Sequence, residues 1–143
     1  MQITKIKSGD AKELSVLDAE CFSVPWSEKS FLEESKNPLS TYFVARENDK
    51  IIGYAGVWIV QDEGQITNIA VLPDFRKKGV ASGLLAEILK ATADCAQIVL
   101  EVRKSNIPAI SLYEKYGFCI AGERKNFYHS PIEDAIIMIR SKK

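Results

Sequence analysis

The sequence lacks the features that mark membrane, secreted and nucleic-acid-binding proteins. No apolar run in its 143 residues approaches the ~20 residues that span a bilayer, and the N-terminus does not have a signal-peptide pattern. Nineteen basic and nineteen acidic residues cancel, so no bulk charge attracts the chain to nucleic acid or to an anionic membrane. We therefore expect neither a membrane nor a nucleic acid as partner.

Cysteine and histidine are scarce as well. Cys21, Cys95 and Cys119 are an odd number at wide spacing without a C-x-x-C motif, which is typical of free thiols in a reducing compartment. The single histidine, His129, and these scattered cysteines do not form the ligand pattern of a structural zinc site. The scarcity predicts a cytoplasmic protein that holds no metal.

The two common nucleotide-binding loops, G-x-x-x-x-G-K-[ST] and G-x-G-x-x-G, are absent. What is present is a strand pattern at residues 65–72, a basic turn at 76–79 and an amphipathic helix pattern at 80–93. The free N–H groups and the positive dipole end of such a helix favour an anion. This stretch therefore predicts a phosphate-binding site.

The remaining chain predicts one domain over residues 1–143, with an ordinary composition of 46% hydrophobic residues and no linker or repeat. The element patterns alternate as in an α/β (α+β) sandwich: a mixed, mostly antiparallel seven-stranded sheet flanked by four helices. The two strands on either side of helix 80–93 should be parallel. Strands are expected near 3–7 and at 41–47, 51–60, 65–72, 97–103, 118–121 and 132–139, and helices after residue 10, at 28–36, at 80–93 and between 106 and 117.

The basic turn, R-K-K-G-V-A, resembles the Q/R-x-x-G-x-G/A signature of the GNAT acetyltransferases. Further motifs resemble the ribosomal-protein-alanine N-acetyltransferase branch of that family and cover nearly the whole chain in order. They are P-W-S-E-K-S-F at 25–31, L-E-V-R-x-S-N at 100–106, A-I-x-L-Y-E-x-x-G-F at 109–118, R-K-N-F-Y at 124–128 and E-D-A-I-I-M at 133–138. Ala81 stands where many relatives have glycine, which the broader signature allows.

The resemblance implies the GNAT fold, acetyl-CoA as cosubstrate and the N-terminal alanine of a small-subunit ribosomal protein as acceptor. The pyrophosphate would lie at the basic turn, and the pantetheine arm would pair with the strand before it. The residues that this assigns to acetyl-CoA are Ile69, Ala70, Val71, Arg76, Lys77, Lys78, Gly79, Val80, Ala81, Ser82 and Asn106.

Acetyl transfer from a thioester to an amine needs a base, a donor to the oxyanion and an acid for the thiolate. The resemblance implies Glu101 as base and Tyr113 as acid. The pattern alone leaves other readings open. Glu101 could pair with Arg103 or Lys5 in a salt bridge, Tyr113 could be a core aromatic, and Asn106 is most simply a helix cap.

Two loops, residues 22–28 and 125–131, are expected to form the walls of the acceptor site. Trp26 in the first loop is either a lid over the core or a wall of the cleft, and Phe127 and Tyr128 belong to the second. Two alternative functions remain: acetylation of a lysine side chain or small amine by the same fold, and a non-catalytic CoA-binding module.

Overall fold

Seven strands form one sheet in the order β1-β2-β3-β4-β5-β7-β6. The structure is a computed structural model that describes residues 1–142. β4 and β5 are parallel and every other neighbouring pair is antiparallel, which confirms the predicted fold class. The strands are β1 (Gln2–Lys5), β2 (Ser40–Glu47), β3 (Lys50–Val60), β4 (Glu63–Val71), β5 (Gln97–Arg103), β6 (Cys119–Tyr128) and β7 (Glu133–Ser141).

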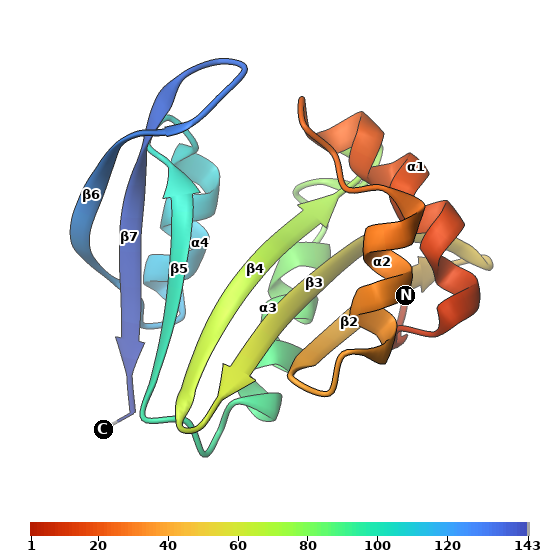
Figure 1. Cartoon of the computed structure of the whole chain (residues 1–143), viewed down its shortest axis with the longest axis horizontal. Coiled ribbons are helices and arrows are strands. Elements are labelled where there is room, and N and C mark those ends of the chain that lie inside the picture. The colour runs from red at the N-terminus through yellow and green to blue at the C-terminus, as the bar shows by residue number, and fades with distance from the viewer. Residues whose placement is uncertain (143) are drawn as a thin grey trace.

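Four helices cover the two faces of the sheet (Figure 1). They are α1 (Ala11–Cys21), α2 (Glu28–Lys36), α3 (Val80–Ala91) and α4 (Ile107–Lys115). The side chains of α1 and α2 form one apolar core with β2, β3 and β4, and those of α3 and α4 form a second core on the opposite face. In the described part of the chain, the first core contains no residue of β5, β7 or β6. The helices α1 and α2 therefore cover their face of the sheet only as far as β4, and the part of that face formed by β5, β7 and β6 is left uncovered.

A wedge opens between the two parallel strands. β4 and β5 pair only over Glu63–Gln65 and Gln97–Val99, and above that point they diverge (Figure 1). A register shift against β3 makes Thr67 an extra residue in β4. Such a bulge bends a strand and changes which side chains face which side. Before the bulge, Ile66 belongs to the core that α3 and α4 form, which we call the α3 core. After the bulge, Ala70 belongs to the core that α1 and α2 form, which we call the α1 core.

The last hairpin differs from the sequence-based expectation. β6 runs from Cys119 to Tyr128, so four residues of the predicted loop 125–131 are strand and the connection to β7 is only residues 129–132. β6 is the edge strand of the sheet and most of its residues are exposed. Backbone pairing with β7 therefore holds it without the apolar alternation that would reveal a strand in the sequence.

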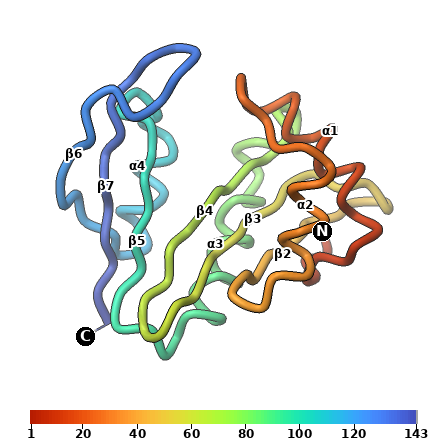
Figure 2. The backbone as a smooth tube through the Cα atoms, viewed as in Figure 1, coloured from red at the N-terminus to blue at the C-terminus, as the bar shows by residue number. Residues whose placement is uncertain are grey.

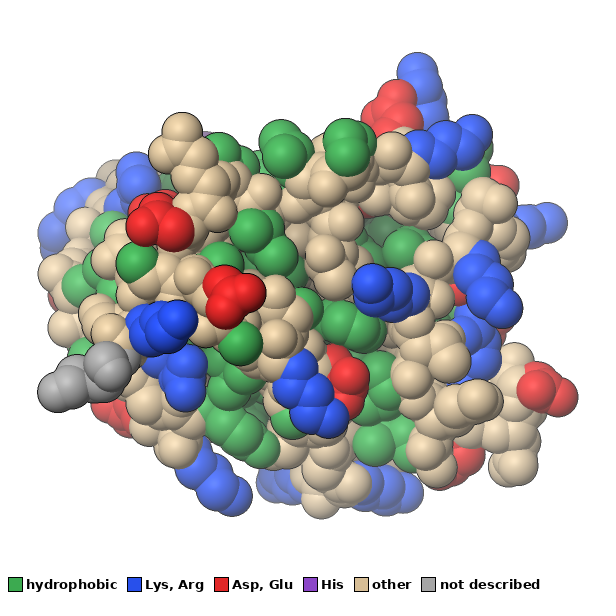
Figure 3. All heavy atoms as spheres, turned by 90° about the horizontal axis from the view of Figure 1, so that it is seen from below, with side chains coloured by type: hydrophobic (Ala, Val, Ile, Leu, Met, Phe, Trp, Pro, Cys, Tyr) green, Lys and Arg blue, Asp and Glu red, His purple; other side chains and the backbone are tan. Residues whose placement is uncertain are grey.

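The two termini lie near opposite ends of the sheet (Figure 2). On the face seen from below, acidic and basic side chains are interspersed with apolar ones (Figure 3). Within residues 1–142 there is no helix of the length and hydropathy needed to cross a membrane. In the same residues no group of three or more His, Cys, Asp or Glu side chains is arranged to hold a metal ion.

Candidate active site

Two cavities occupy the wedge and its mouth. The first, which we call the α3 cavity, has a volume of about 680 Å³ and lies between β4, the start of α3 and α4. The second, the β5 cavity, has about 640 Å³ and lies between the α1–α2 loop, β4, β5 and the end of β6. The cavities meet, because they share six lining residues: Cys21, Phe22, Ile69, Asn106, Ala109 and Tyr113.

The α3 cavity gathers nearly all the residues that the sequence assigns to the cosubstrate. Ten of the eleven line it: Ile69, Ala70, Val71, Arg76, Lys77, Gly79, Val80, Ala81, Ser82 and Asn106. Lys78 is the exception, and its Nζ lies 5.6 Å from the ring centroid of Phe75. The residues on either side of Lys78 have positive φ, 63° at Lys77 and 83° at Gly79. Phe75, Pro108 and Leu112 also line the cavity and were not predicted.

The turn before α3 presents backbone N–H groups to this cavity. Gly79 is the N-cap of α3 with φ 83° and ψ 6°, a conformation that glycine adopts without strain. The Gly83 N–H donates to the Gly79 carbonyl at 3.0 Å, so the N–H groups of residues 80–82 precede the first bond of the helix. A Cβ at Gly79 would meet no atom within 4 Å. Glycine is thus required here by its positive φ and not by crowding.

β4 turns one edge of its backbone toward the wedge. The Leu72 N–H donates to the Ile52 carbonyl of β3, and successive residues of a strand alternate in direction, so Ile69 and Val71 face away from β3. The Val71 carbonyl accepts from Arg76 Nε at 3.0 Å. The Ile69 N–H donates to Asn68 Oδ1 at 3.1 Å. Within residues 1–142 no strand pairs with this edge at residues 69–71, and its pairing with a pantetheine arm stays a prediction.

Glu101 lies on the face of β5 that the helices leave open. Along β5 the even-numbered residues are buried in the α3 core and the odd-numbered ones are partly exposed, as strand alternation requires. Glu101 Oε2 is 2.6 Å from Arg124 Nε of β6, which is 58% exposed. The possible partners named from the sequence, Arg103 and Lys5, are therefore wrong. Glu101 lines the β5 cavity.

Tyr113 occupies the junction of the cavities. Its side chain is buried among apolar residues, with its ring 5.7 Å from that of Phe118, so it is a core aromatic by packing. Its hydroxyl forms no hydrogen bond within residues 1–142, yet no unpaired polar atom there is fully buried, so the hydroxyl reaches the cavity. Burial, followed by the nearby Tyr128, raises the pKa of Tyr113 above its usual value.

Asn106 combines two roles. Its Oδ1 accepts from the Ala109 N–H at 3.3 Å and caps α4, and the residue lines both cavities. The cap fixes the start of α4, and Tyr113 lies almost two turns further along the same helix.

All three residues predicted for the acceptor walls line the β5 cavity. Trp26 is half-buried and its ring lies 5.5 Å from Phe31, so it both covers the α1 core and faces the cavity. Phe127 and Tyr128 come from the end of β6. Burial, with the charge of Glu101 as the next cause, raises the pKa of Tyr128 to about 12.

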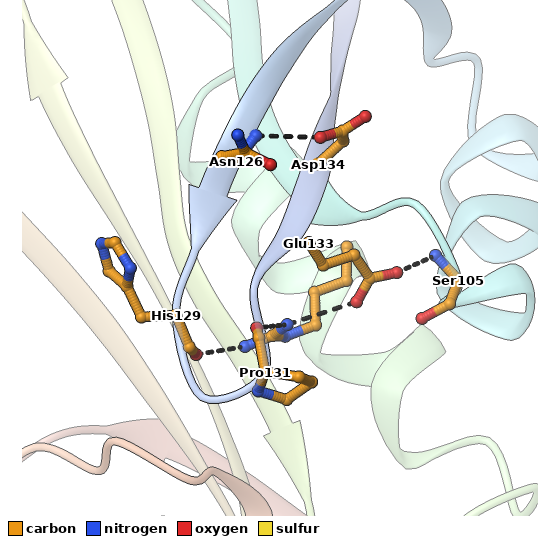
Figure 4. Close-up of polar contacts among 7 residues, drawn as sticks. Ser105, Asn126, His129, Pro131, Glu133 and Asp134 are labelled. Carbon is orange, nitrogen blue, oxygen red and sulfur yellow. Dashed lines mark hydrogen bonds and ion pairs between the residues drawn. The ribbon is translucent and has the colours of Figure 1, made fainter.

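The β6–β7 connection is held by a clamp that the sequence did not reveal. Arg103 donates to the carbonyls of His129 and Pro131, each at 3.0 Å, and its Cζ lies 4.5 Å from the Tyr128 ring centroid. It also pairs with Glu133 at 3.2 Å, while the Ser105 N–H donates to the same carboxylate at 2.7 Å (Figure 4). Bonds from Ser105 and Arg103 hold the pKa of Glu133 below its usual range.

Comparison with known proteins places this chain in a family. Residues 11–118 match the model of the Acetyltransferase (GNAT) family, which is most of the chain. The chain therefore belongs to this family and is an acetyl-transferring enzyme. The resemblance to its ribosomal-protein-alanine N-acetyltransferase branch is confirmed as well: the chain is similar to the [ribosomal protein bS18]-alanine N-acetyltransferase of Escherichia coli (strain K12), with 35% identity over 95% of this chain and 94% of that protein.

Solved structures agree. The crystal structure of the ribosomal-protein-S18-alanine N-acetyltransferase from Escherichia coli has a TM-score of 0.90 and 33% identity, covering 98% of this chain and 92% of that one. PaiA N-acetyltransferase from Thermoplasma acidophilum was solved in complex with coenzyme A. Its structure has a TM-score of 0.83 at 19% identity, and the match covers 99% of this chain and 98% of that one. At that identity the second likeness concerns the fold alone.

Proposed function

We propose that this protein transfers the acetyl group of acetyl-CoA to the α-amine of the N-terminal alanine of a ribosomal protein, in the cytoplasm, and that residues 1–143 act as one catalytic domain. The observation that carries the proposal is the meeting of two cavities at Tyr113 and Asn106. One cavity has an anion-binding helix start, and the other has a carboxylate and aromatic walls. The similarity to bS18-alanine N-acetyltransferases favours the ribosomal acceptor.

The residues of the α3 cavity fit acetyl-CoA. Free N–H groups at the start of α3, with Arg76 and Lys77 beside them, suit the pyrophosphate, and the open edge of β4 suits the pantetheine arm. When bound, acetyl-CoA supplies the activated acetyl group as a thioester. The Ile69 N–H, which faces the wedge, is placed to donate to the oxyanion that develops on the thioester carbonyl.

In this mechanism Glu101 removes a proton from the acceptor amine, directly or through a water molecule. Its Oε2 is engaged by Arg124, so Oε1 is the atom left to accept the proton. Tyr113 then gives its proton to the departing thiolate. A phenol with an ordinary pKa of ~10 is protonated at neutral pH, and burial raises the pKa of Tyr113 further, so the proton is present but is held more tightly than in a free phenol.

The proton balance favours an α-amine over a lysine. An α-amino group titrates near ~8 and a lysine near ~10.4, so deprotonating the lysine at neutral pH costs about 3 kcal/mol more. A single glutamate, acting directly or through a water molecule, is a modest base and suits the easier proton. Trp26, Phe127 and Tyr128 line the β5 cavity, and we expect these aromatic walls to limit the room for the residues that flank an internal lysine on both sides.

A peptide acetylation assay with mass-spectrometric assignment of the modified site tests the proposal. One peptide carries a free N-terminal alanine, and its matched control has the same sequence with a blocked terminus and an internal lysine; a small polyamine is the third acceptor. We expect acetylation at the free terminus, at a far higher rate than at the lysine. Comparable rates would favour the lysine alternative, and no transfer to any acceptor would favour the CoA-binding module.

A further inference from the structure

Asp18 is a buried carboxylate that the proposed chemistry does not use. It is one of two polar or charged residues that are buried in the described part of the chain, at 1% exposure; the other, Thr92, bonds to carbonyls of its own helix. A buried carboxylate is costly unless hydrogen bonds or an opposite charge compensate it. Burial raises the pKa of Asp18 above its usual value.

Neutral donors alone compensate this carboxylate. Oδ2 accepts from the backbone N–H of Trp26 at 2.8 Å, and Oδ1 accepts from the Tyr54 hydroxyl at 2.7 Å. No salt bridge to Asp18 occurs within residues 1–142. The carboxylate thus joins the loop that carries Trp26 to the middle of β3.

The chain of hydrogen bonds continues into the wedge. Asn68 Nδ2 donates to the Tyr54 oxygen at 3.1 Å, and Asn68 Oδ1 accepts from the Ile69 N–H at 3.1 Å. The bulge at Thr67 makes this connection possible, because it puts Asn68 on the α1 side while the Ile69 N–H faces the wedge. Every donor has one acceptor, and the two branches, one from Ile69 through Asn68 and Tyr54 and one from Trp26, both donate toward the Asp18 carboxylate.

The two ends of this chain serve the two substrates. Trp26 is a wall of the β5 cavity, where the acceptor would bind, and Ile69 lines both cavities on the edge of β4 where the thioester would lie. We propose that Asp18 is a positioning residue for acetyl transfer, which sets the Trp26 wall directly and the Ile69 N–H through Tyr54 and Asn68. This inference rests on the proposed function and goes beyond it by assigning a role to a residue outside both cavities.

The mechanism of positioning follows from donors and acceptors. A substrate carbonyl that takes the Ile69 N–H must displace Asn68 Oδ1. Asn68 then stays bonded to Tyr54 through Nδ2 and does not follow into the wedge. By accepting the Tyr54 proton, the Asp18 carboxylate fixes the hydroxyl with its proton turned away from Asn68 and its oxygen turned toward Nδ2.

Three variants separate the two ends. Asp18→Ala removes both bonds, so the peptide KM should rise and kcat should fall, each by roughly tenfold. Tyr54→Phe cuts only the branch to Ile69, so kcat should fall by a similar factor with the peptide KM unchanged. Asp18→Asn keeps an acceptor for the Trp26 N–H but turns an amide nitrogen toward Tyr54, which reverses the branch; it should behave like Tyr54→Phe.

Thr92→Val is the matched control, because it also removes a buried hydrogen-bonding group, on a residue that lines neither cavity. It should change neither kinetic constant. The second readout is amide hydrogen exchange by NMR, which needs no activity. Exchange should become faster at Trp26 and Ile69 in Asp18→Ala, and at Ile69 alone in Tyr54→Phe and Asp18→Asn.

Several results would overturn the inference. Unchanged kinetics and unchanged exchange in Tyr54→Phe and Asp18→Asn would do so even if Asp18→Ala did not fold. Equal effects in Thr92→Val would show general destabilisation instead of positioning. If the wild-type protein acetylated no acceptor, the proposed function would fail, and the exchange measurements alone would decide whether Asp18 holds Trp26 and Ile69.

Discussion

The two cavities that meet at Tyr113 are built from different parts of the chain. The α3 cavity is made largely by consecutive residues, β4 and the turn into α3, and it offers backbone groups to its ligand. The β5 cavity is lined by four segments that are far apart in the sequence: the α1–α2 loop, β4, β5 with α4, and the end of β6 with its connection to β7. Under the proposed function, the difference teaches that a cosubstrate common to a family would be bound by a local motif, whereas the acceptor would be selected by long-range packing.

Substitution of Tyr113, one of the six residues that line both cavities, should have the largest effect. Tyr113→Phe keeps the buried ring and removes the acid, so turnover should fall by roughly 10²–10⁴-fold while acetyl-CoA affinity is kept. A single-turnover assay measures the chemical step and calorimetry measures the affinity. Tyr116→Phe, at the end of the same helix and outside both cavities, is the control. Wild-type turnover in Tyr113→Phe would reduce Tyr113 to a core aromatic.

Next in size is a change confined to the α3 cavity. Gly79→Val forces a β-branched residue to φ 83°, which costs about 1–3 kcal/mol and distorts the N–H groups at the start of α3. We expect acetyl-CoA to bind roughly tenfold more weakly by calorimetry, with the fold retained. Gly9→Val is the control, because Gly9 also has open space around it but no positive φ. Unchanged affinity would remove the turn from the cosubstrate site.

A smaller effect is expected from the clamp of the β5 cavity. Arg103→Met leaves the carbonyls of His129 and Pro131 without their donor and loosens the connection that carries Tyr128. The peptide KM should rise severalfold, since a hydrogen bond to a charged group contributes about 1.5–3 kcal/mol and part is recovered by water. The control is Lys104→Met, which loses only the exposed ion pair with Glu123 and should leave the peptide KM unchanged. A weakened acetyl-CoA affinity in Arg103→Met would contradict the separation of the two cavities.

The smallest effect concerns pH. Burial raises the pKa of Asp18, so the folded state binds a proton on this carboxyl more tightly than the unfolded state does. As the pH rises from ~3.9, the pKa of an unfolded aspartate, through the raised pKa of the folded state, the free energy of unfolding of the wild type therefore decreases. The free energy of unfolding of Asp18→Asn, measured relative to wild type by urea titration, should therefore increase between pH 4 and pH 7. A difference that is independent of pH would mean that Asp18 has an ordinary pKa.

The same contrast explains what could be predicted from the sequence. The strand-turn-helix at 65–91 has strong local signals, a β-branched alternation, a basic glycine turn and an apolar helical stripe, and the structure has these elements within two residues of the prediction. The bounds of α2 and β5 agree with the prediction for the same reason. Local periodicity is enough when an element buries one regular face.

The β5 cavity could be predicted only in part. Sequence motifs predict the aromatic walls Trp26, Phe127 and Tyr128. The sequence predicts a loop where the end of β6 lies, because an exposed edge strand has no apolar alternation. The ion pair of Glu101 with Arg124 and the clamp by Arg103 depend on strand order, which brings β6 and β7 beside β5. Asp18 gave no signal, since a carboxylate on a short amphipathic helix is ordinarily exposed.

A structure of the ternary complex tests the central claim most directly. Crystals of Glu101→Gln with CoA and a peptide that begins with alanine would trap both ligands, because the variant keeps the shape of the site and lacks the base. We predict the pyrophosphate at the N–H groups of residues 80–82 and the terminal amine nitrogen in the β5 cavity, within one water molecule of the residue 101 side chain. A peptide bound elsewhere, or CoA in the β5 cavity, would contradict the division of the site between the two cavities.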